Sequence, residues 1–594
     1  MTEPVLVCVA WPYASADIHV GNMTGSHLPA DIVARYHRMR GRQVLMVSGS
    51  DSHGTPITVR ADAENSTPME VYQRFHHDFI DLFQKTGISY DCFTSTHTEN
   101  HFDVAQKMFT VLKDNGFLYT DVQKQWYSPA QQRFLPDRYV EGTCYICGYE
   151  GARSDQCDRC GNLLESEKLL DPRSKIDGST PELRETEHFF LDLGKLEPEV
   201  IEFLKERESY WRPNVLRQSL GQIESNPLRG RAITRDLEWG IPVPLEGYDD
   251  KRLYVWFEAV MGYLSAAVEA NKLAGNPDGW RNWWTNPASK TFYFIGKDNI
   301  PFHAIIWPGE LLGAGTDFDR LMGAEDPQPF VLPYDVPANE FMNMEGQKIS
   351  GSRNWGVWVL DYLERYDPDP LRYYLTVSMP ETRDTDWAWE DFYNRNNGEL
   401  IATWGNLANR VLGFAHKRWE GIVPDPGELT EKDRGLLDTI NGGFTSVGQL
   451  IEEVKLRAAL AEAIRLASEV NKYLDDTEPW KTFKTDEAAA ARAIFTAMKA
   501  IDSLKVLFAP FLPFSSEKIH AFLNYEQPLF GTPCTQAVED NLGSHTVLRY
   551  DPANASGEWK PSQLEPGRAF QQPAPLFTKL DPSIVAEELA RLGK

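Results

Sequence analysis

With 594 residues the chain is too long for a single hydrophobic core, and 42% hydrophobic residues with 17 tryptophans exclude a disordered protein, so we expect about two to four folded domains. The formal net charge of -26 argues against a DNA-binding protein or a general nucleic-acid binder, although a structured RNA could still bind a local basic surface. No apolar run could span a bilayer and no basic segment precedes the first apolar run, so the sequence predicts a cytoplasmic protein without a membrane partner.

The N-terminal segment predicts a strand, a helix and a second strand. Residues 5–10, VLVCVA, form an apolar run typical of a strand buried on both faces. Apolar residues then recur every three or four positions up to Gly41, which indicates a helix, and residues 43–47 are the second strand. Such units build parallel sheets that bind ligands at the carboxyl ends of their strands. We therefore expect an α/β fold with a Rossmann-type parallel sheet.

Between the first strand and the helix lies the segment IHVGN, residues 18–22. Gly21 allows a ligand to approach the backbone, and free N–H groups at a helix start attract phosphate. His19 and Asn22 add side-chain hydrogen-bond donors. A lone histidine before a helix is more often a cap or a packed ring, so this segment alone indicates a ligand site only weakly.

The segment SGSDSHGTPI, residues 48–57, follows the second strand. Its glycines, serines and charged residue suit a ligand loop at the carboxyl end of a strand. We interpret Asp51 as a carboxylate for a cationic amine, with a turn-capping aspartate as the alternative.

Four of the seven cysteines are clustered as two Cys-x2-Cys pairs, Cys144 with Cys147 and Cys157 with Cys160, each followed by a glycine. Four thiolates at this spacing are typical of a structural, tetrahedral zinc site that leaves no position for a catalytic water. Disulfides are the alternative, and a reducing compartment disfavours them.

Aromatic residues and one histidine mark the middle of the chain. Trp256 and Tyr263 lie in the segment YVWFEAVMGYL, and Asn299, His303 and Trp307 share one face of a predicted helix that follows a strand. From the residues alone, a ligand pocket and a packed core are equally compatible with this pattern.

Two later segments also suggest ligand contacts. The loop EGQKISGSR, residues 345–353, is rich in glycine, serine and cations, and a mobile loop of this kind can close on a triphosphate. Beyond residue 386 the helical period dominates and predicts an all-α bundle. In it Asn406 and Arg410 lie one turn apart, and Trp480 follows a helix; together they could stack on and hydrogen-bond single-stranded bases, although Trp480 by itself is more often a core residue.

In this order the motifs resemble those of methionyl-tRNA synthetases, which are class I aminoacyl-tRNA synthetases. Residues 18–22 resemble the HIGH signature, WPYAS at residues 11–15 and SGSDSHGTPI are similar to that family's stretches, and KISGS at residues 348–352 resembles the KMSKS loop. The resemblance implies that the protein joins methionine to ATP as methionyl-adenylate and passes methionine to tRNA(Met). It also implies one structural Zn²⁺ and Mg²⁺ bound with ATP.

The resemblance assigns a role to each candidate residue. ATP handling and catalysis would fall to two groups at the first helix and the loop, namely His19, Gly21, Asn22, Lys348, Ser350 and Arg353. The methionine site would be formed by Tyr13, Asp51, Trp256, Tyr263, His303 and Trp307, the anticodon site by Asn406, Arg410 and Trp480, and the zinc site by Cys144, Cys147, Cys157 and Cys160.

The chain departs from the family pattern at several of these places. Asn22 replaces the second histidine of HIGH, Gly351 replaces the second lysine of KMSKS, Glu258 stands where an aspartate is common, and Asn299 stands where an aliphatic residue is common. A tRNA-binding paralogue without catalytic activity is therefore one alternative. A class I synthetase for another amino acid is the second, disfavoured by mostly aromatic pocket candidates and by a chain too short for a large editing insertion.

We expect a monomer, because the chain has no room for an appended dimerising domain. The predicted regions are residues 1–117 (first Rossmann half), 118–217 (connective insertion with a zinc knuckle), 218–325 (second Rossmann half), 326–385 (linker with the KMSKS-like loop), 386–548 (α-helical anticodon-binding domain) and 549–594 (a tail that packs back on the body).

Overall fold

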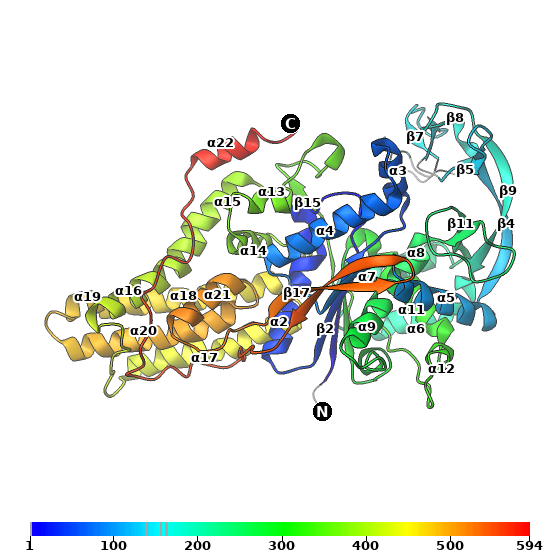
Figure 1. The fold of residues 1–594 in the computed structure, drawn as a ribbon. Coiled ribbons are helices and arrows are strands. Elements are labelled where there is room, and N and C mark those ends of the chain that lie inside the picture. The colour runs from blue at the N-terminus through cyan, green and yellow to red at the C-terminus, as the bar shows by residue number, and fades with distance from the viewer. Residues whose placement is uncertain (1–2, 137–138, 155–156, 158, 161–163, 165) are drawn as a thin grey trace.

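The structure is a computed structural model that describes residues 3–136, 139–154, 157, 159–160, 164 and 166–594. A parallel sheet lies at its centre, with a helical bundle on one side and a β-rich insertion on the other (Figure 1). Within the described residues, no helix combines the length and the apolar character needed to cross a membrane.

The central sheet has the strand order β14-β13-β1-β2-β3-β18-β17. Its first five strands run parallel, with Val7 of β1 paired to both Met46 of β2 and Phe292 of β13. Every residue of β1 is buried, which confirms the predicted two-sided strand. The chain moves outward from β1 to β2 and β3, then crosses to β13 and β14, so the sheet reverses its strand order beside β1. The bounds are β1 Val5–Val9, β2 Val44–Ser50, β3 Cys92–Ser95, β13 Lys290–Gly296 and β14 Ala338–Asn339.

Helices cover both faces of this sheet. Alternate residues of β1 pack into two separate cores, Val7 with helices α2, α4 and α14, and Leu6 with α5, α6, α9 and α11. The covering helices are α2 Leu28–Met39, α3 Thr55–Glu64, α4 Pro68–Thr86, α5 Glu99–Asp114, α6 Leu193–Glu206, α7 Pro213–Ser225, α8 Val255–Glu258, α9 Gly262–Leu273, α10 Arg281–Trp284, α11 Trp307–Ala314, α12 Asp317–Leu321, α13 Val359–Leu363, α14 Pro368–Val377 and α15 Trp389–Arg395.

The remaining two strands of the central sheet come from far along the chain. The hairpin of β17 Thr532–Asp540 and β18 Gly543–Asp551 lies antiparallel against β3, where Leu548 pairs with Phe93. We expected helices up to residue 548, so this hairpin is a correction. It covers the sheet edge at β3, which would otherwise expose unpaired backbone groups.

The insertion projects from the catalytic sheet on two long antiparallel strands (Figure 1). Beyond these, a three-stranded sheet carries the cysteine cluster over a small core that includes Trp126 and Tyr139. The strands are β4 Leu118–Ser128, β5 Arg133–Phe134, β6 Val140–Thr143, β7 Ala152–Arg153, β8 Leu170–Ser174, β9 Glu182–Leu191, β10 Arg231–Ala232, β11 Thr234–Asp236 and β12 Lys251–Leu253; the loop region adds β15 Met342–Met344 and β16 Thr385–Trp387.

The predicted helical bundle is present. Leu460, Ile494 and Ile501, chosen for their helical spacing, are fully buried in it. After the hairpin, the tail runs over the body to a short helix, as predicted (Figure 1). The helices are α16 Asn406–Arg418, α17 Glu431–Glu452, α18 Leu456–Thr477, α19 Pro479–Thr482, α20 Glu487–Phe508, α21 Pro513–Phe522 and, in the tail, α22 Ser583–Leu589.

Candidate active site

A cavity of 430 Å³ opens at the carboxyl ends of β1, β2 and β13, beside the point where the strand order reverses. Segments that are far apart in sequence meet in its wall. The predicted residues that line it are Tyr13, His19, Gly21, Asn22, Asp51, Trp256, Tyr263, His303 and Lys348.

The His19 ring is fixed by the turn that it caps. Its Nδ1 accepts the N–H groups of Gly21 at 3.1 Å and Asn22 at 3.3 Å. Burial lowers the His19 pKa to about 4, so the ring is neutral near pH 7. Because Nδ1 is an acceptor, the proton is at Nε2, which leaves His19 a neutral hydrogen-bond donor.

This arrangement changes the expected role of the helix start. The N–H groups of Gly21 and Asn22, which we expected to attract phosphate, are already bonded to His19. Gly21 matters here for a steric reason: a Cβ at this position would lie 2.9 Å from the His19 ring. The Asn22 side chain accepts the His19 backbone N–H at 3.1 Å, which leaves its amide N–H groups as donors.

Asp51 is a carboxyl group in the cavity wall whose negative charge has few hydrogen-bond or ionic partners. It is 4% exposed, and the backbone N–H of His53 lies 3.5 Å from its Oδ1. Among the described residues, no basic side chain forms an ion pair with it. Burial, followed by the nearby charge of Glu258, raises its pKa well above the ordinary value. A cationic group beside Asp51 would favour the ionised carboxylate and so lower this pKa.

His303 and Tyr263 form a fixed polar pair in the opposite wall. His303 Nδ1 lies 2.9 Å from the carbonyl oxygen of Asn299, and a carbonyl can only accept, so Nδ1 carries the proton. Nε2 therefore accepts the Tyr263 hydroxyl at 2.7 Å. Burial lowers the His303 pKa to about 4, which keeps this ring neutral as well.

Glu258 anchors a buried hydrogen-bond network behind this wall. Its two oxygens accept from His53 Nδ1 at 2.9 Å and His101 Nε2 at 2.8 Å, and all three side chains are almost completely buried. Although burial opposes ionisation, the two histidines hold the Glu258 pKa below its ordinary value. Neither histidine is among the predicted site residues: His53 stands within SGSDSHGTPI and could have been chosen there, but nothing in the sequence marks His101.

The aromatic part of the wall is only partly as predicted. Trp256 packs on Phe302 with ring centroids 4.1 Å apart, and both rings line the cavity. Trp307 does not line it. That residue is fully buried, and its Nε1 donates to the Tyr293 hydroxyl at 3.1 Å, so its place in the methionine site stays a prediction. Other lining residues that we missed include Trp11, Asp298 and Phe341.

The KISGSR segment forms a short hairpin at the mouth of the cavity. Ser350 and Trp355 exchange two backbone hydrogen bonds of 2.9 Å, and the tip is the turn Gly351–Arg353. Lys348 lines the cavity, whereas Ser350 and Arg353 lie on the hairpin outside it. The Ile349 side chain reaches the backbone of Gly21, so the hairpin rests on the His19 turn.

The three proposed anticodon residues lie together on the bundle. The Arg410 guanidinium lies 4.6 Å from the Trp480 ring centroid and donates to Asn471 at 3.2 Å. Asn406 and Arg410 are exposed and Trp480 is half-buried. Asn406 and Arg410 thus lie one turn apart on α16, and the Trp480 ring of α19 lies beside Arg410. A stacking ring, a cation and an amide of this kind can bind single-stranded bases.

The four clustered cysteines also converge, with all sulfur atoms within 4.8 Å of one another. Tetrahedral zinc with bonds of about 2.3 Å requires sulfur atoms about 3.8 Å apart, and Cys147 and Cys157 are separated by 3.6 Å. Gly148 turns the chain after the first pair with a φ of +72°. The donor set and its spacing therefore fit a metal ion.

The comparisons with known proteins agree with this geometry. Residues 5–412 match the family model for tRNA synthetases class I (M), and residues 423–549 match that for the anticodon binding domain of methionyl tRNA ligase. The chain is 52% identical over 594 residues to the methionine–tRNA ligase of Thermomicrobium roseum, covering 100% of this chain and 99% of the relative. It is 46% identical over 602 residues to that of Thermobifida fusca, covering 99% of this chain and 98% of the relative.

A solved structure shows the same fold. The chain is similar to the crystal structure of Mycobacterium tuberculosis methionyl-tRNA synthetase bound by methionyl-adenylate, with a TM-score of 0.75 and 23% identity over 97% of this chain and 100% of that one. The family model over residues 5–412 and the relatives of about 50% identity establish that the chain belongs to the methionyl-tRNA synthetase family of class I aminoacyl-tRNA synthetases.

Proposed function

We propose that this protein is a methionine–tRNA ligase that works in two steps. In the first, a carboxylate oxygen of methionine attacks the α-phosphorus of ATP; a new O–P bond forms, and the bond to the β-phosphate oxygen breaks as pyrophosphate leaves with its electron pair. In the second, a ribose hydroxyl at the 3′ end of tRNA(Met) attacks the acyl carbon, and AMP leaves. One observation carries the proposal: a single cavity contains an uncompensated carboxylate, a neutral histidine donor and a loop lysine.

The substrate amine would pair with Asp51. An ammonium group supplies the charge that this buried carboxylate lacks, and the pairing orients the methionine carboxylate for attack. Tyr13, Trp256 and Tyr263 offer aromatic surfaces for the thioether, a soft group that packs well against ring edges. His303 fixes the direction of the Tyr263 hydroxyl.

The phosphates would be held from two sides. His19 Nε2–H and the Asn22 amide donate from the helix turn, while Lys348 supplies a cation from the hairpin. Arg353 and Ser350 would reach the phosphates only if the hairpin moved inward, as loops over triphosphates do. Mg²⁺ bound with ATP would share the phosphate charge. No protein nucleophile is needed for the transfer to tRNA, because methionyl-adenylate is a mixed anhydride from which AMP is a good leaving group.

Two further sites complete the proposal. Trp480, Arg410 and Asn406 would read the anticodon by stacking and hydrogen bonds. Cys144, Cys147, Cys157 and Cys160 would hold one Zn²⁺, which would cross-link the tip of the insertion and leave no coordination position for chemistry.

Amino-acid-dependent exchange of labelled pyrophosphate into ATP tests the activity. We expect exchange with L-methionine and none with leucine, isoleucine, valine or cysteine. Exchange with one of those instead would show a synthetase for another amino acid. Binding of tRNA(Met) without any exchange would show the non-catalytic paralogue, which Asn22 and Gly351 otherwise suggest.

A further inference from the structure

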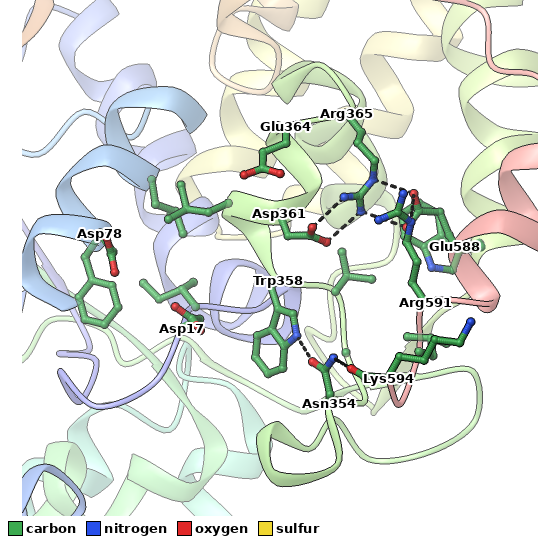
Figure 2. A pocket seen from close by; sticks show the side chains of 18 residues that line it. Asp17, Asp78, Asn354, Trp358, Asp361, Glu364, Arg365, Glu588, Arg591 and Lys594 are labelled. Carbon is green, nitrogen blue, oxygen red and sulfur yellow. Dashed lines mark hydrogen bonds and ion pairs between the residues drawn. The ribbon is translucent and has the colours of Figure 1, made fainter. Parts of the chain in front are cut away.

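A second cavity, of 520 Å³, is lined by Asn354 and Trp358, which follow the KISGSR segment (Figure 2). One wall comes from Asp17 and Ile18, directly before His19, and another from Asp78 of α4. The end of the chain, from Glu588 to Lys594, forms the wall opposite them. The cavity therefore lies between the residues before His19 and the tail, and residues 354 and 356–358 line it as well.

The chain end bonds directly to that tip. The Gly593 N–H donates to the carbonyl oxygen of Asn354 at 3.0 Å. The Asn354 side-chain amide donates to the main-chain oxygen of Lys594 (Figure 2). The Asn354 side-chain oxygen accepts Trp358 Nε1–H at 2.7 Å. Asn354 directly follows Arg353, so residues 593–594 hold the turn that carries the hairpin's outer cation.

The tail can act as a fixed support because it is anchored upstream of these two residues. Glu588 of α22 is 4% exposed, and its carboxylate accepts Arg365 Nε at 2.9 Å and the Tyr366 hydroxyl at 2.9 Å. Arg365 lies just after α13 and also pairs with Asp361 (Figure 2). None of these groups belongs to the hairpin. The tail is therefore anchored to residues outside the hairpin that it contacts.

The other end of the hairpin is attached to the active site. Val20 N–H donates to Val357 O and Val359 N–H donates to Ile18 O, both at 3.0 Å, and the His19 and Trp358 rings lie 5.7 Å apart. The same segment, residues 354–359, thus connects the chain end to the His19 turn.

We propose that Gly593 and Lys594 are positioning residues for the ATP step. Through their main-chain bonds to Asn354 they fix the position of the hairpin, so that Lys348 and Arg353 can approach the phosphates. This inference rests on the proposed role of the hairpin in ATP binding. The side chain of Lys594 is not part of the arrangement, because Asn354 binds only its backbone carbonyl.

The test is removal of residues 593–594 from the protein of residues 1–594, which leaves α22 and the Glu588 anchor in place. Two lost hydrogen bonds should raise the KM for ATP in pyrophosphate exchange by about five- to tenfold and leave the KM for methionine unchanged. Trypsin should also cut faster after Lys348 or Arg353, as followed by mass spectrometry, since an unsupported hairpin samples open conformations more often.

Two single variants separate the explanations. Lys594→Gln keeps the main-chain oxygen and should behave as the unchanged protein; a loss equal to that of the truncation would assign the effect to the side-chain charge and overturn the proposal. Lys579→Ala, an exposed change in the same tail, controls for tail substitutions in general.

The proposal also fails if the truncated protein keeps both its ATP KM and its rate of tryptic cleavage. Lys348→Ala distinguishes this failure from an error in the proposed function. If Lys348→Ala abolishes exchange while the truncation changes nothing, only the positioning role is wrong; if Lys348→Ala itself has no effect, the hairpin does not handle ATP.

Discussion

The cavity at the carboxyl ends of the strands and the proposed anticodon surface present polar groups in opposite ways. Asp51 and His303 in the cavity wall and Glu258 behind it are each less than 5% exposed, and the hydrogen bonds of His303 and Glu258 determine where the protons lie. On the bundle, Asn406 and Arg410 are exposed to solvent, and Arg410 makes a single hydrogen bond of 3.2 Å among the described residues.

This difference predicts different sensitivities. Burial makes electrostatic interactions strong and makes an unpaired group costly, so single changes in the cavity should have large effects. Stacking and surface contacts are individually weaker and are screened by salt. The chemistry should therefore depend on single buried groups, whereas tRNA selection should depend on several exposed ones.

Asp51→Asn tests the buried side most severely. Because the ammonium group would lose its ionic partner inside the protein, we expect kcat/KM for methionine in pyrophosphate exchange to fall on the order of 100- to 1,000-fold. In the unchanged protein the raised Asp51 pKa has a second effect: binding of the ammonium releases a proton, so the KM for methionine falls as pH rises through that pKa.

The Asn variant should lose this pH dependence along with its affinity. Asp103→Asn, a surface change on α5 next to Lys107, is the matched control and should leave both properties intact. A variant that keeps more than a tenth of the activity would contradict the assignment of Asp51 to the amine.

Trp480→Ala tests the exposed side. Loss of one stacking surface should raise the KM for tRNA in aminoacylation by about 10- to 100-fold, while methionine activation measured without tRNA stays unchanged. Arg465→Ala, an exposed arginine paired with Glu462 on the same bundle, controls for general loss of positive charge. A parallel fall in activation would mean that Trp480 supports the fold, since Phe414 packs edge-on against it.

The features that the sequence predicts are those that depend on residues close to one another along the chain. The buried β1 strand, the bundle helices and the cysteine pairs follow from periodicity and spacing, which involve residues close in sequence. The wall residues Asp51, Tyr263 and His303 could be chosen because each follows a strand or carries a suitable group, and the resemblance then supplied their roles.

The remaining features depend on contacts between distant segments. His101 becomes part of the site only because α5 packs beside Glu258, 157 positions away. Trp307 has the spacing of a pocket residue, yet the Tyr293 hydroxyl gives its N–H a partner in the core. The β17–β18 hairpin alternates weakly, and its place is determined by the open edge of β3.

Mild acid should separate the two regions by stability. Burial lowers the pKa of His19, His76 and His303 to about 4 and that of His27 and His37 to about 3, all in the catalytic part. An unfolded chain binds these protons near pH 6.5, so stability is complete above that pH and is lost as pH falls toward 4.

Hydrogen exchange at pH 7 and pH 4.5, corrected for intrinsic rates, should therefore show α2 and α4 losing protection before α17 and α18, which contain no histidine. Earlier loss in the bundle would show that carboxylates rather than histidines dominate the acid response.

The smallest expected effect concerns Gly351, the position where a second lysine is missing from the loop. Gly351 is exposed, its backbone is not in the left-handed region, and a Cβ there would meet only Trp358 at 3.8 Å, so Gly351→Lys fits without strain. Because the new cation would act through solvent, we expect pyrophosphate exchange to rise by only about two- to fivefold, with a larger gain at low salt.

Gly351→Gln, similar in length but neutral, should give no gain. A rise of 100-fold or more with lysine would mean that an exposed loop cation affects activity as much as a buried cavity residue does. The difference between buried and exposed sites would then not apply to ATP binding. No rise at any salt concentration would indicate that Lys348, with Arg353, already provides all the charge that the departing pyrophosphate needs.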